Sequence, residues 1–276
     1  MRPLLKLSWL AGALVALAAG PAAAQKPAGF DCLIEPSQTL DIRSPVTGLI
    51  ERVHATRGEA IRRGAPLVTL ESTVERAAAE LSRYRAGTSG GIQQAEARLQ
   101  FAEKRLKRRA NLAEDQYTSV QERDDAEGER DIARAELQTA REVRRLAELE
   151  SAYATAQLGQ RVLKSPIDGV VVEQNMHAGE LADASEAKAA ILKIAQTNPL
   201  RVRLILPFVH YARVKPGMVA EITPEPPLQG RYQAAVTSID RVVDAASGTF
   251  QVRIDLPNPK GQLPGGTKCR AVLPGL

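Results

Sequence analysis

Hydrophobic residues recur every seven positions through the middle of the chain, between Val74 and Leu158. In the second part of this stretch, the repeated residues are alanines: Ala126, Ala133, Ala140, Ala147 and Ala154. Leu137 and Leu158 lie on the same face. In the first part, two rows share a face: Ala78, Arg85, Ile92, Leu99, Leu106 and Ala113, and beside them Val74, Leu81, Ala95 and Ala102. Seven-residue spacing of this kind is typical of two helices packed along a seam.

The pattern predicts an α-helical coiled-coil hairpin over residues 73–160, with a turn near 115–119. An arm of this length forms a rod of roughly 60 Å at 1.5 Å per residue. Glycines between Gly87 and Gly91 interrupt the first arm. Because Ala78 and Ile92 are two heptads apart, we expect the helix to resume in the same register. A hinge and a tolerated local weakness both account for the glycines.

The segments on either side of the hairpin are copies of each other. Ser44-Pro45, Gly48 and Gly58 recur 121 positions later as Ser165-Pro166, Gly169 and Gly179. Each copy contains short apolar runs with turn residues between them, as short strands do. We therefore expect residues 39–72 and 161–196 to form the two halves of one small β-sandwich, with the hairpin inserted between them.

Residues 197–276 read as a small antiparallel β-barrel. Phe250, Val252, Ile254 and Leu256 alternate with polar residues, and turns such as Lys215-Pro216-Gly217 separate the runs. Residues 25–38 predict an entering strand that could join this barrel. The fold class expected is therefore mostly β with one long helical hairpin.

The first 24 residues have the pattern of a cleavable signal peptide: Arg2 and Lys6, an apolar core over 7–19, and Ala22-Ala23-Ala24. We expect export, and not as a lipoprotein, because Cys32 follows Phe30-Asp31. In an oxidising compartment Cys32 and Cys269 could form a disulfide, or remain two separate buried thiols.

No catalytic, cofactor-binding or metal-binding constellation is predicted. His54, His177 and His210 have no metal-ligand spacing. The net charge of +5 and the 4% aromatic content argue against nucleic-acid binding. Near the turn, a basic run over 104–109 faces an acidic run over 122–129, which predicts ion pairs between the arms.

The repeated halves resemble lipoyl or biotinyl carrier domains, but the turn that carries the modified lysine in those domains is replaced here by the hairpin. A split lipoyl-like domain around a hairpin, followed by a barrel, resembles the periplasmic adaptor (membrane fusion protein) family of tripartite efflux pumps and HlyD-like secretion adaptors. Similar motifs in that family's barrel are Thr249-Phe250-Gln251-Val252-Arg253, Asn258-Pro259-Lys260-Gly261 and Pro264-Gly265-Gly266.

The resemblance also implies a contact site at the hairpin turn. Many members carry an Arg-x3-Leu-x6-Ser pattern there that meets an outer-membrane channel, and Arg108, Leu112 and Ser119 have this spacing. The alternative is that Arg108 is one of five basic residues near the turn and that Ser119 only caps a helix.

By this resemblance the protein would be a non-enzymatic periplasmic adaptor without cofactors. It would link an inner-membrane transporter to an outer-membrane channel protein as a homo-oligomeric ring, a trimer or hexamer. Because the sequence ends at Leu276, soon after the expected last barrel strand, we expect no membrane-proximal fourth domain. The alternative function is an envelope scaffold protein with a coiled-coil spacer and no role in transport.

Overall fold

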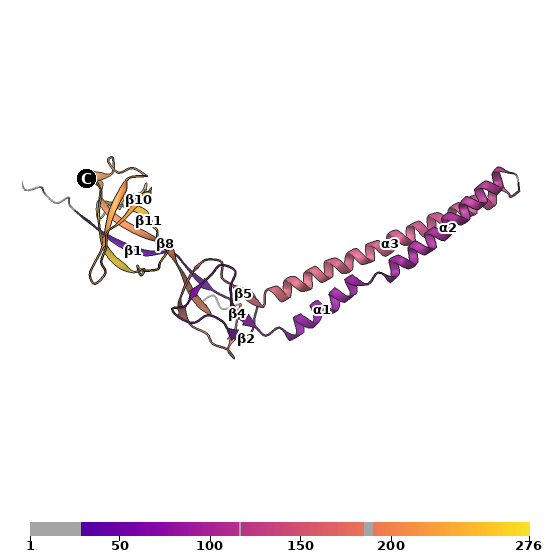
Figure 1. The fold of residues 1–276 in the computed structure, drawn as a ribbon, viewed down its shortest axis with the longest axis horizontal. Coiled ribbons are helices and arrows are strands. Elements are labelled where there is room, and N and C mark those ends of the chain that lie inside the picture. Colours follow the sequence, from indigo (N-terminus) through magenta and orange to yellow (C-terminus); the bar gives the residue numbers. More distant parts are fainter. Residues whose placement is uncertain (1–28, 116, 185–189) are drawn as a thin grey trace, which may run out of the picture.

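The computed structural model describes residues 29–115, 117–184 and 190–276, and the predicted signal peptide lies outside them. The molecule is elongated, with a β-barrel at one end, a smaller β-sandwich in the middle and a long helical hairpin at the other end (Figure 1). The fold class predicted from the sequence is confirmed.

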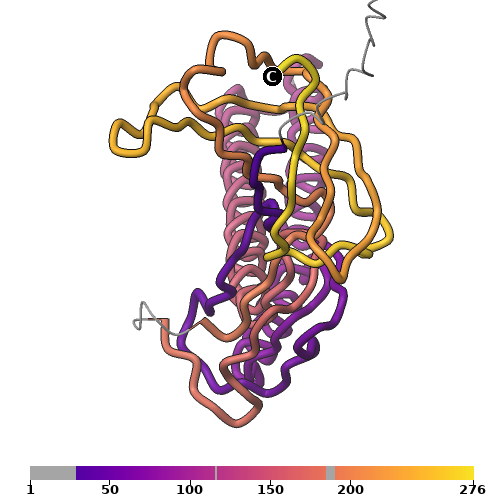
Figure 2. Tube along the Cα trace, turned by 90° about the vertical axis from the view of Figure 1, so that its left-hand side faces the viewer, coloured from indigo at the N-terminus to yellow at the C-terminus, as the bar shows by residue number. Residues whose placement is uncertain are grey.

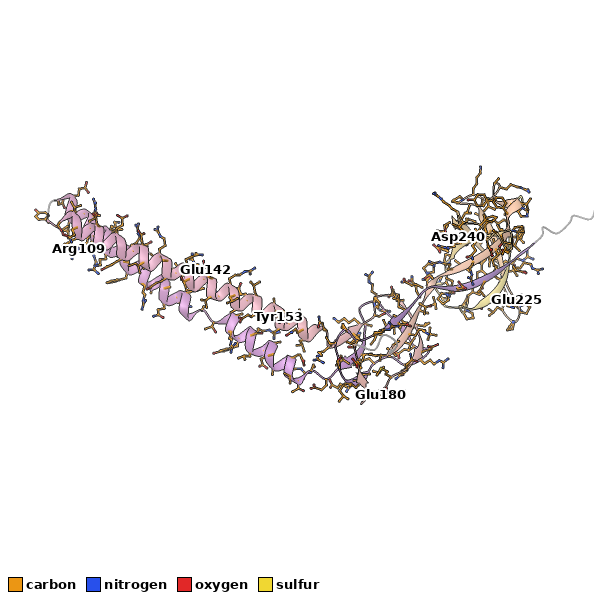
Figure 3. The ribbon with its side chains drawn as sticks, turned by 180° about the vertical axis from the view of Figure 1, so that it is seen from behind. Arg109, Glu142, Tyr153, Glu180, Glu225 and Asp240 are labelled. Atoms are coloured by element: carbon orange, nitrogen blue, oxygen red, sulfur yellow. A yellow bond between two sulfur atoms is a disulfide. The ribbon has the colours of Figure 1, made fainter. Side chains whose placement is uncertain are left out.

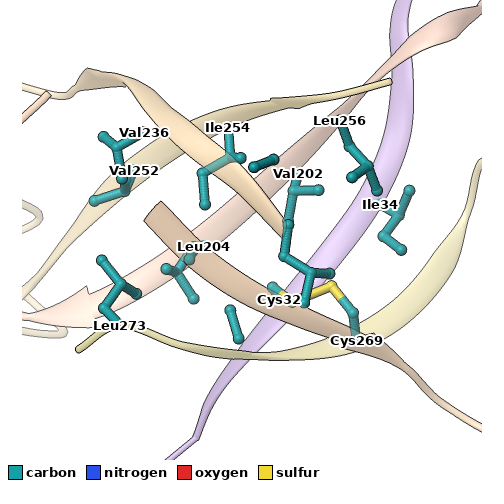
Figure 4. Close-up of a cluster of buried hydrophobic side chains, with 14 of the residues drawn as sticks. Cys32, Ile34, Val202, Leu204, Val236, Val252, Ile254, Leu256, Cys269 and Leu273 are labelled. Carbon is teal, nitrogen blue, oxygen red and sulfur yellow. A yellow bond between two sulfur atoms is a disulfide. The ribbon is translucent and has the colours of Figure 1, made fainter. Parts of the chain in front are cut away.

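Six strands close the barrel in the order β1-β12-β9-β10-β11-β8, because β8 also pairs with β1. These strands are β1 (Phe30–Ile42), β8 (Leu192–Pro207), β9 (Val219–Pro224), β10 (Tyr232–Ile239), β11 (Thr249–Leu256) and β12 (Thr267–Val272). A short 3-10 helix, η1 (Phe208–His210), follows β8. The alternating residues predicted to share a face of β11 are all buried, and they fill the interior with Ile34, Val202 and Leu204 (Figure 4). This alternation explains why the barrel was visible in the sequence.

The sandwich contains the repeated segments and the inner ends of β1 and β8. Its other strands are β2 (Gly48–Val53), β3 (Ala60–Ile61), β4 (Pro66–Leu70), β5 (Val162–Lys164), β6 (Gly169–Gln174) and β7 (Leu181–Ala182). Strand β2 of the first copy pairs with β7 of the second, and β3 of the first pairs with β6 of the second. The short strands β3 and β7 therefore have their partners in the opposite copy, while β2 and β6 also pair within their own copy, with β4 and β8.

Hydrogen bonds between the copies are reciprocal at the same offset of 121 residues. The N–H of Gly58 donates to the carbonyl of Val171 at 2.8 Å, and the N–H of Gly179 donates to that of Ile50 at 2.8 Å. Both glycines have positive φ angles, 86° and 92°, which L side chains rarely adopt. The repeated glycines are thus required by equivalent turns of one structure.

The two Ser-Pro pairs form equivalent turns as well. Ser44 Oγ donates to the carbonyl of Val46 at 2.5 Å, and Ser165 Oγ donates to that of Ile167 at 2.6 Å. Both serines are buried, so these local bonds satisfy hydroxyl groups that water does not reach.

Strand β1 continues to Ile42, beyond residue 38, where the predicted entering strand ends. It pairs with β12 over residues 30–34 and then with β8 as far as Ile42, with a register irregularity between Pro36 and Gln38. The irregularity accommodates a proline that cannot donate a ladder hydrogen bond. Residues 30–42 therefore serve the barrel and the sandwich alike.

The hairpin consists of α1 (Thr73–Gly87), α2 (Gly90–Glu114) and α3 (Val120–Gly159). Ala126, Ala133 and Leu137 of α3 and Ala95 and Ala102 of α2 are buried along the seam. The heptad prediction is confirmed for these two helices, and the turn lies where it was predicted.

The predicted register of α1 is wrong. Val74 and Leu81, expected in the seam, are 73% and 52% exposed, whereas Ala79 is 1% exposed. The side chains that face inward are those of Glu75, Ala79, Ser82 and Ala86. Thr88 is extended between the two helices, so from Ala86 to Ile92 the buried row advances six residues in place of seven. The glycine-rich break therefore shifts the buried face by one position.

Cys32 and Cys269 are cross-strand partners in β1 and β12 and form a disulfide (Figure 4). Their Cα atoms are 4.9 Å apart, within the range that a disulfide requires. The bond links the first and last strands of the barrel.

We expect Gly169→Ala to destabilise the sandwich far more than Gly48→Ala, although the two positions are equivalent in the repeat. A Cβ at Gly169 would lie 2.1 Å from the backbone oxygen of Ala195, whereas a Cβ at Gly48 would lie 2.6 Å from the guanidinium of Arg161, a side chain that can shift more easily than a backbone at the expense of a hydrogen bond. Overpacking of this kind costs about 1–3 kcal/mol. Denaturant unfolding of both variants measures the difference, and equal loss would contradict the assigned contacts.

Replacing both cysteines by alanine should lower the free energy of unfolding by about 2–4 kcal/mol, the usual contribution of a disulfide. Chemical denaturation with and without a reductant measures it. The reductant should destabilise the native protein and leave the double variant unchanged. Alkylation of two free thiols in the protein isolated from an oxidising compartment would contradict the bond.

Candidate partner-binding site at the hairpin tip

The hairpin is fixed to the sandwich at its base by Arg161, which follows α3. Its guanidinium forms an ion pair with Glu75 of α1 and donates to the carbonyl of Thr47 at 3.1 Å. The backbone of Arg161 also accepts a hydrogen bond from Leu70, the last residue of β4. Both members of the ion pair are mostly buried, which lessens the screening of their attraction by water.

Helix α1 begins at this base, and the residue before its N-cap stabilises its N-terminus. Ser72 occupies the N-cap position, but its side chain makes no capping hydrogen bond. The carboxylate of Glu71 accepts instead from the N–H of Thr73 at 2.8 Å, and its hydrogen bonds with Thr73 lower the pKa of Glu71. An acidic group in this place stabilises the helix N-terminus.

At the far end, Ser119 starts the second arm as an N-cap. Its hydroxyl accepts from the N–H of Glu122 at 3.2 Å, so the capping role considered in the sequence is realised. Ser119 itself is exposed. Its lone pairs and its backbone are therefore within reach of another molecule as well.

Ion pairs between the arms align the outer part of the hairpin, as the opposed charge runs predicted. Arg105 pairs with Glu129 at 2.7 Å, and Arg109, labelled at the tip in Figure 3, pairs with Glu122 at 2.5 Å. These pairs are exposed, so each contributes little to stability. Their main effect is that they occupy Glu122 and Glu129, and in the described part of the chain the other basic residues of α2 near the tip have no acidic partner.

Arg108 is such a group. Among the described residues, none forms an ion pair or hydrogen bond with its guanidinium. Arg108 and Leu112 line one shallow hollow of about 330 Å³ on α2, together with Phe101, Arg105 and Arg109. The structure therefore brings together two of the three residues singled out in the sequence, while Ser119 lies across the turn and outside this hollow.

Phe101 was missed in the sequence analysis. Its ring is 63% exposed, and it lies seven and eleven residues before Arg108 and Leu112, so the three share one stripe of the helix. The signal available in the sequence was a rare aromatic residue next to the seam position Ala102. An exposed ring and leucine beside a free guanidinium suit a partner with an apolar notch and an acidic group.

Within the described residues, no group of three or more His, Cys, Asp or Glu side chains is arranged to hold a metal ion. In that same part of the chain, no helix combines the length and the apolar character that crossing a bilayer requires.

Comparison with family models identifies the class of this architecture. The CzcB-like barrel-sandwich hybrid domain matches residues 38–196, which include the sandwich and the hairpin. The CusB-like beta-barrel domain matches residues 210–274. Because the first match covers more than half of the chain, the protein belongs to the CzcB-like barrel-sandwich hybrid family.

Characterised relatives carry the name of membrane fusion or export proteins. The pyoverdine export membrane fusion protein PvdR of Pseudomonas putida is 22% identical over 253 residues, covering 83% of this chain and 64% of the relative. The multidrug resistance protein MdtE of Escherichia coli is 25% identical over 251 residues, covering 86% and 61%. The chain thus spans less than two thirds of the length of these relatives.

Among solved structures, MacA from Actinobacillus actinomycetemcomitans superimposes with a TM-score of 0.73 over 90% of this chain and 78% of that one, at 21% identity. The membrane fusion protein Spr0693 from Streptococcus pneumoniae gives a TM-score of 0.61 over 89% of this chain and 98% of that one, at 16% identity. At these identities the likeness concerns the fold.

Ser119→Ala should lower the free energy of unfolding of the hairpin by about 1 kcal/mol, because α3 loses its capping oxygen. Ser89→Ala is the matched control, since Ser89 holds the N-cap position of α2 without a capping hydrogen bond. Thermal denaturation followed by the helical circular dichroism signal compares them. An equal effect of both substitutions would argue against the cap.

Proposed function

We propose that the protein is a periplasmic adaptor that links an inner-membrane transporter to an outer-membrane channel protein. The observation that carries this proposal is the tip of the hairpin. A free guanidinium, a leucine and an exposed ring lie together on the outer half of α2, and the facing helix α3, with 40 residues, gives the rod a length of about 60 Å. A rod with a fixed base and a binding surface near its tip is suited to contact a partner far from the sandwich.

Relatives named for pyoverdine export and for multidrug resistance support this role. Transport itself would belong to the partner, and the adaptor's contribution would be position. We further propose that copies assemble side by side into a trimeric or hexameric ring, with residues 1–24 directing export. In this arrangement the lipoyl-like segments 39–72 and 161–196, the hairpin 73–160 and the barrel 197–276 act as successive levels.

The rival proposal is an envelope scaffold in which the hairpin is only a spacer. The two proposals differ at the tip. A spacer needs arms that hold together, which the seam and the ion pairs already provide. A spacer does not require an unpaired arginine beside two exposed apolar side chains. An adaptor that binds a partner through its tip does require such groups.

Arg108→Asp should abolish contact with an outer-membrane partner while leaving the folded protein stable, because the side chain is exposed and forms no pair among the described residues. A photo-crosslinking residue at Leu112 measures the contact in cells that express the protein at its natural level. We expect an adduct with an outer-membrane protein, reduced at least about tenfold by the charge reversal, as for loss of a charge-assisted contact.

Lys107→Asp provides the control, because it makes the same charge change on the adjacent, exposed position of α2. It should retain the adduct. If Arg108→Asp crosslinks as well as the native protein, this tip does not form the contact. If the native tip captures no outer-membrane protein at all, the scaffold proposal is favoured.

A further inference from the structure

The end of the barrel that points away from the hairpin exposes apolar side chains on two loops. We call residues 208–218, which follow β8, and residues 240–248, which join β10 to β11, the outer barrel end. Figure 2 looks onto this end of the molecule. The N–H of Phe208 donates to the carbonyl of Gly248 at 2.9 Å, so the two loops are joined at their bases.

Each loop carries an apolar side chain that the barrel leaves uncovered. Val209 is 76% exposed and Val242 is 83% exposed, and Phe208 is exposed beside Val209. The first loop is nevertheless held in place. The ring of Tyr211 lies 5.1 Å from the ring of buried Phe250 and 5.5 Å from that of Phe208. Burial of Tyr211 thus fixes η1 with Val209 directed outward, and the exposure does not come from a loose loop.

The charges around these side chains are basic. Residues 208–218 contain Arg213 and Lys215 and no acidic residue. Both are exposed, as is Arg241 on the second loop. Arg213 also donates one hydrogen bond to the carbonyl of Gly275.

The acidic groups of the second loop are engaged within it. Asp240 forms an ion pair with Arg253 at 3.2 Å. Asp244 accepts from Ser247 Oγ at 2.8 Å and from the N–H of Ala246 at 2.9 Å, which lowers its pKa. Asp240 is neutralised by Arg253, whereas exposed Asp244 keeps its negative charge, so the three cations Arg213, Lys215 and Arg241 still outnumber the acidic charge on these two loops.

We propose that the outer barrel end docks on the surface of an anionic phospholipid bilayer, with Phe208, Val209 and Val242 entering the headgroup region. Arg213, Lys215 and Arg241 would contact lipid phosphates there. Apolar side chains inserted at the interface and cations facing anionic lipid are the two contributions that hold proteins on such surfaces. Anionic lipid is favoured over an acidic protein because the apolar side chains project from two loops at one end of the barrel, beside an excess of cations.

The proposal rests on the proposed function only for the assignment of the inner membrane as the bilayer that the barrel faces. If the tip faces an outer-membrane partner, the opposite pole of the molecule in Figure 1 faces the inner membrane. Docking would then hold the barrel at the membrane surface independently of any transporter. The binding itself is a property of the purified chain and can be tested without a partner.

The test is flotation of the purified full chain with vesicles of phosphatidylethanolamine and phosphatidylglycerol, compared with vesicles of phosphatidylcholine alone. We expect binding to the anionic vesicles that weakens with added salt, and little binding to the neutral ones. Val209→Ser/Val242→Ser should weaken the partition about tenfold, since two apolar side chains no longer leave water. Arg213→Glu/Lys215→Glu should abolish it.

Matched substitutions on the hairpin distinguish this end from general effects. Ile132→Ser/Val143→Ser removes two apolar side chains that are each 64% exposed, and Lys104→Glu/Lys107→Glu makes the same change of net charge. Both controls should bind as the native chain does. All variants should remain folded, because the altered residues are exposed; only Arg213→Glu/Lys215→Glu should melt slightly lower, since Arg213 loses its hydrogen bond to the carbonyl of Gly275.

Absence of binding to anionic vesicles would overturn the proposal, as would loss of binding in the hairpin controls to the same extent. Capture of a membrane protein by the outer barrel end, with no affinity for protein-free vesicles, would assign this surface to a protein partner and also overturn it. None of these results bears on the crosslink at Leu112, so this proposal and the proposed function can fail separately.

Discussion

The pairing of two chain segments 121 residues apart is the constraint on which the remaining structure depends. Each copy pairs two strands of its own, β2 with β4 and β6 with β8, but β3, β5 and β7 find their partners only in the other copy. Once the copies meet, the ends of the intervening hairpin are brought to one place, where Arg161 binds Glu75 of the opposite arm. A thin two-helix rod with a core of alanines and few larger side chains gains its direction from that base, since its own packing is narrow.

Much of this fold could be predicted, because its strongest signals are periodic. Alternation in β11, heptads in α2 and α3 and the repeated Ser-Pro and glycine positions each reflect a local requirement that the structure contains. The register of α1 could not be predicted in the same way. Val74 and Leu81 fit a heptad, yet a single extended residue, Thr88, rotates the helix, and partly buried Glu75 pairs with an arginine distant in sequence. The spacing of apolar residues in the sequence indicates neither the rotation at Thr88 nor the ion pair of Glu75.

The candidate site at the hairpin tip was likewise predicted only in part from the sequence. The resemblance directed attention to Arg108, Leu112 and Ser119, and the structure adds what spacing cannot express. Arg105 and Arg109 are neutralised by acids of the other arm, while Arg108 has no such partner in the described residues. Phe101 joins the stripe only once the face of α2 is known. Which charge is free depends on pairing across the hairpin, and this is a property of the folded chain.

The continuity of β1 and β8 through barrel and sandwich has a mechanical consequence. Both strands run along the molecule, antiparallel to each other, from Cys32 opposite Leu204 to Ile42 opposite Leu192. A tensile force between the hairpin tip and the barrel is therefore carried, at the junction of barrel and sandwich, by the two covalent backbones of β1 and β8. No side-chain interface has to bear this force. Bending meets much less resistance, since among the described residues a two-stranded ribbon is all that crosses there. The molecule should behave as an inextensible tether that still allows its two halves to tilt.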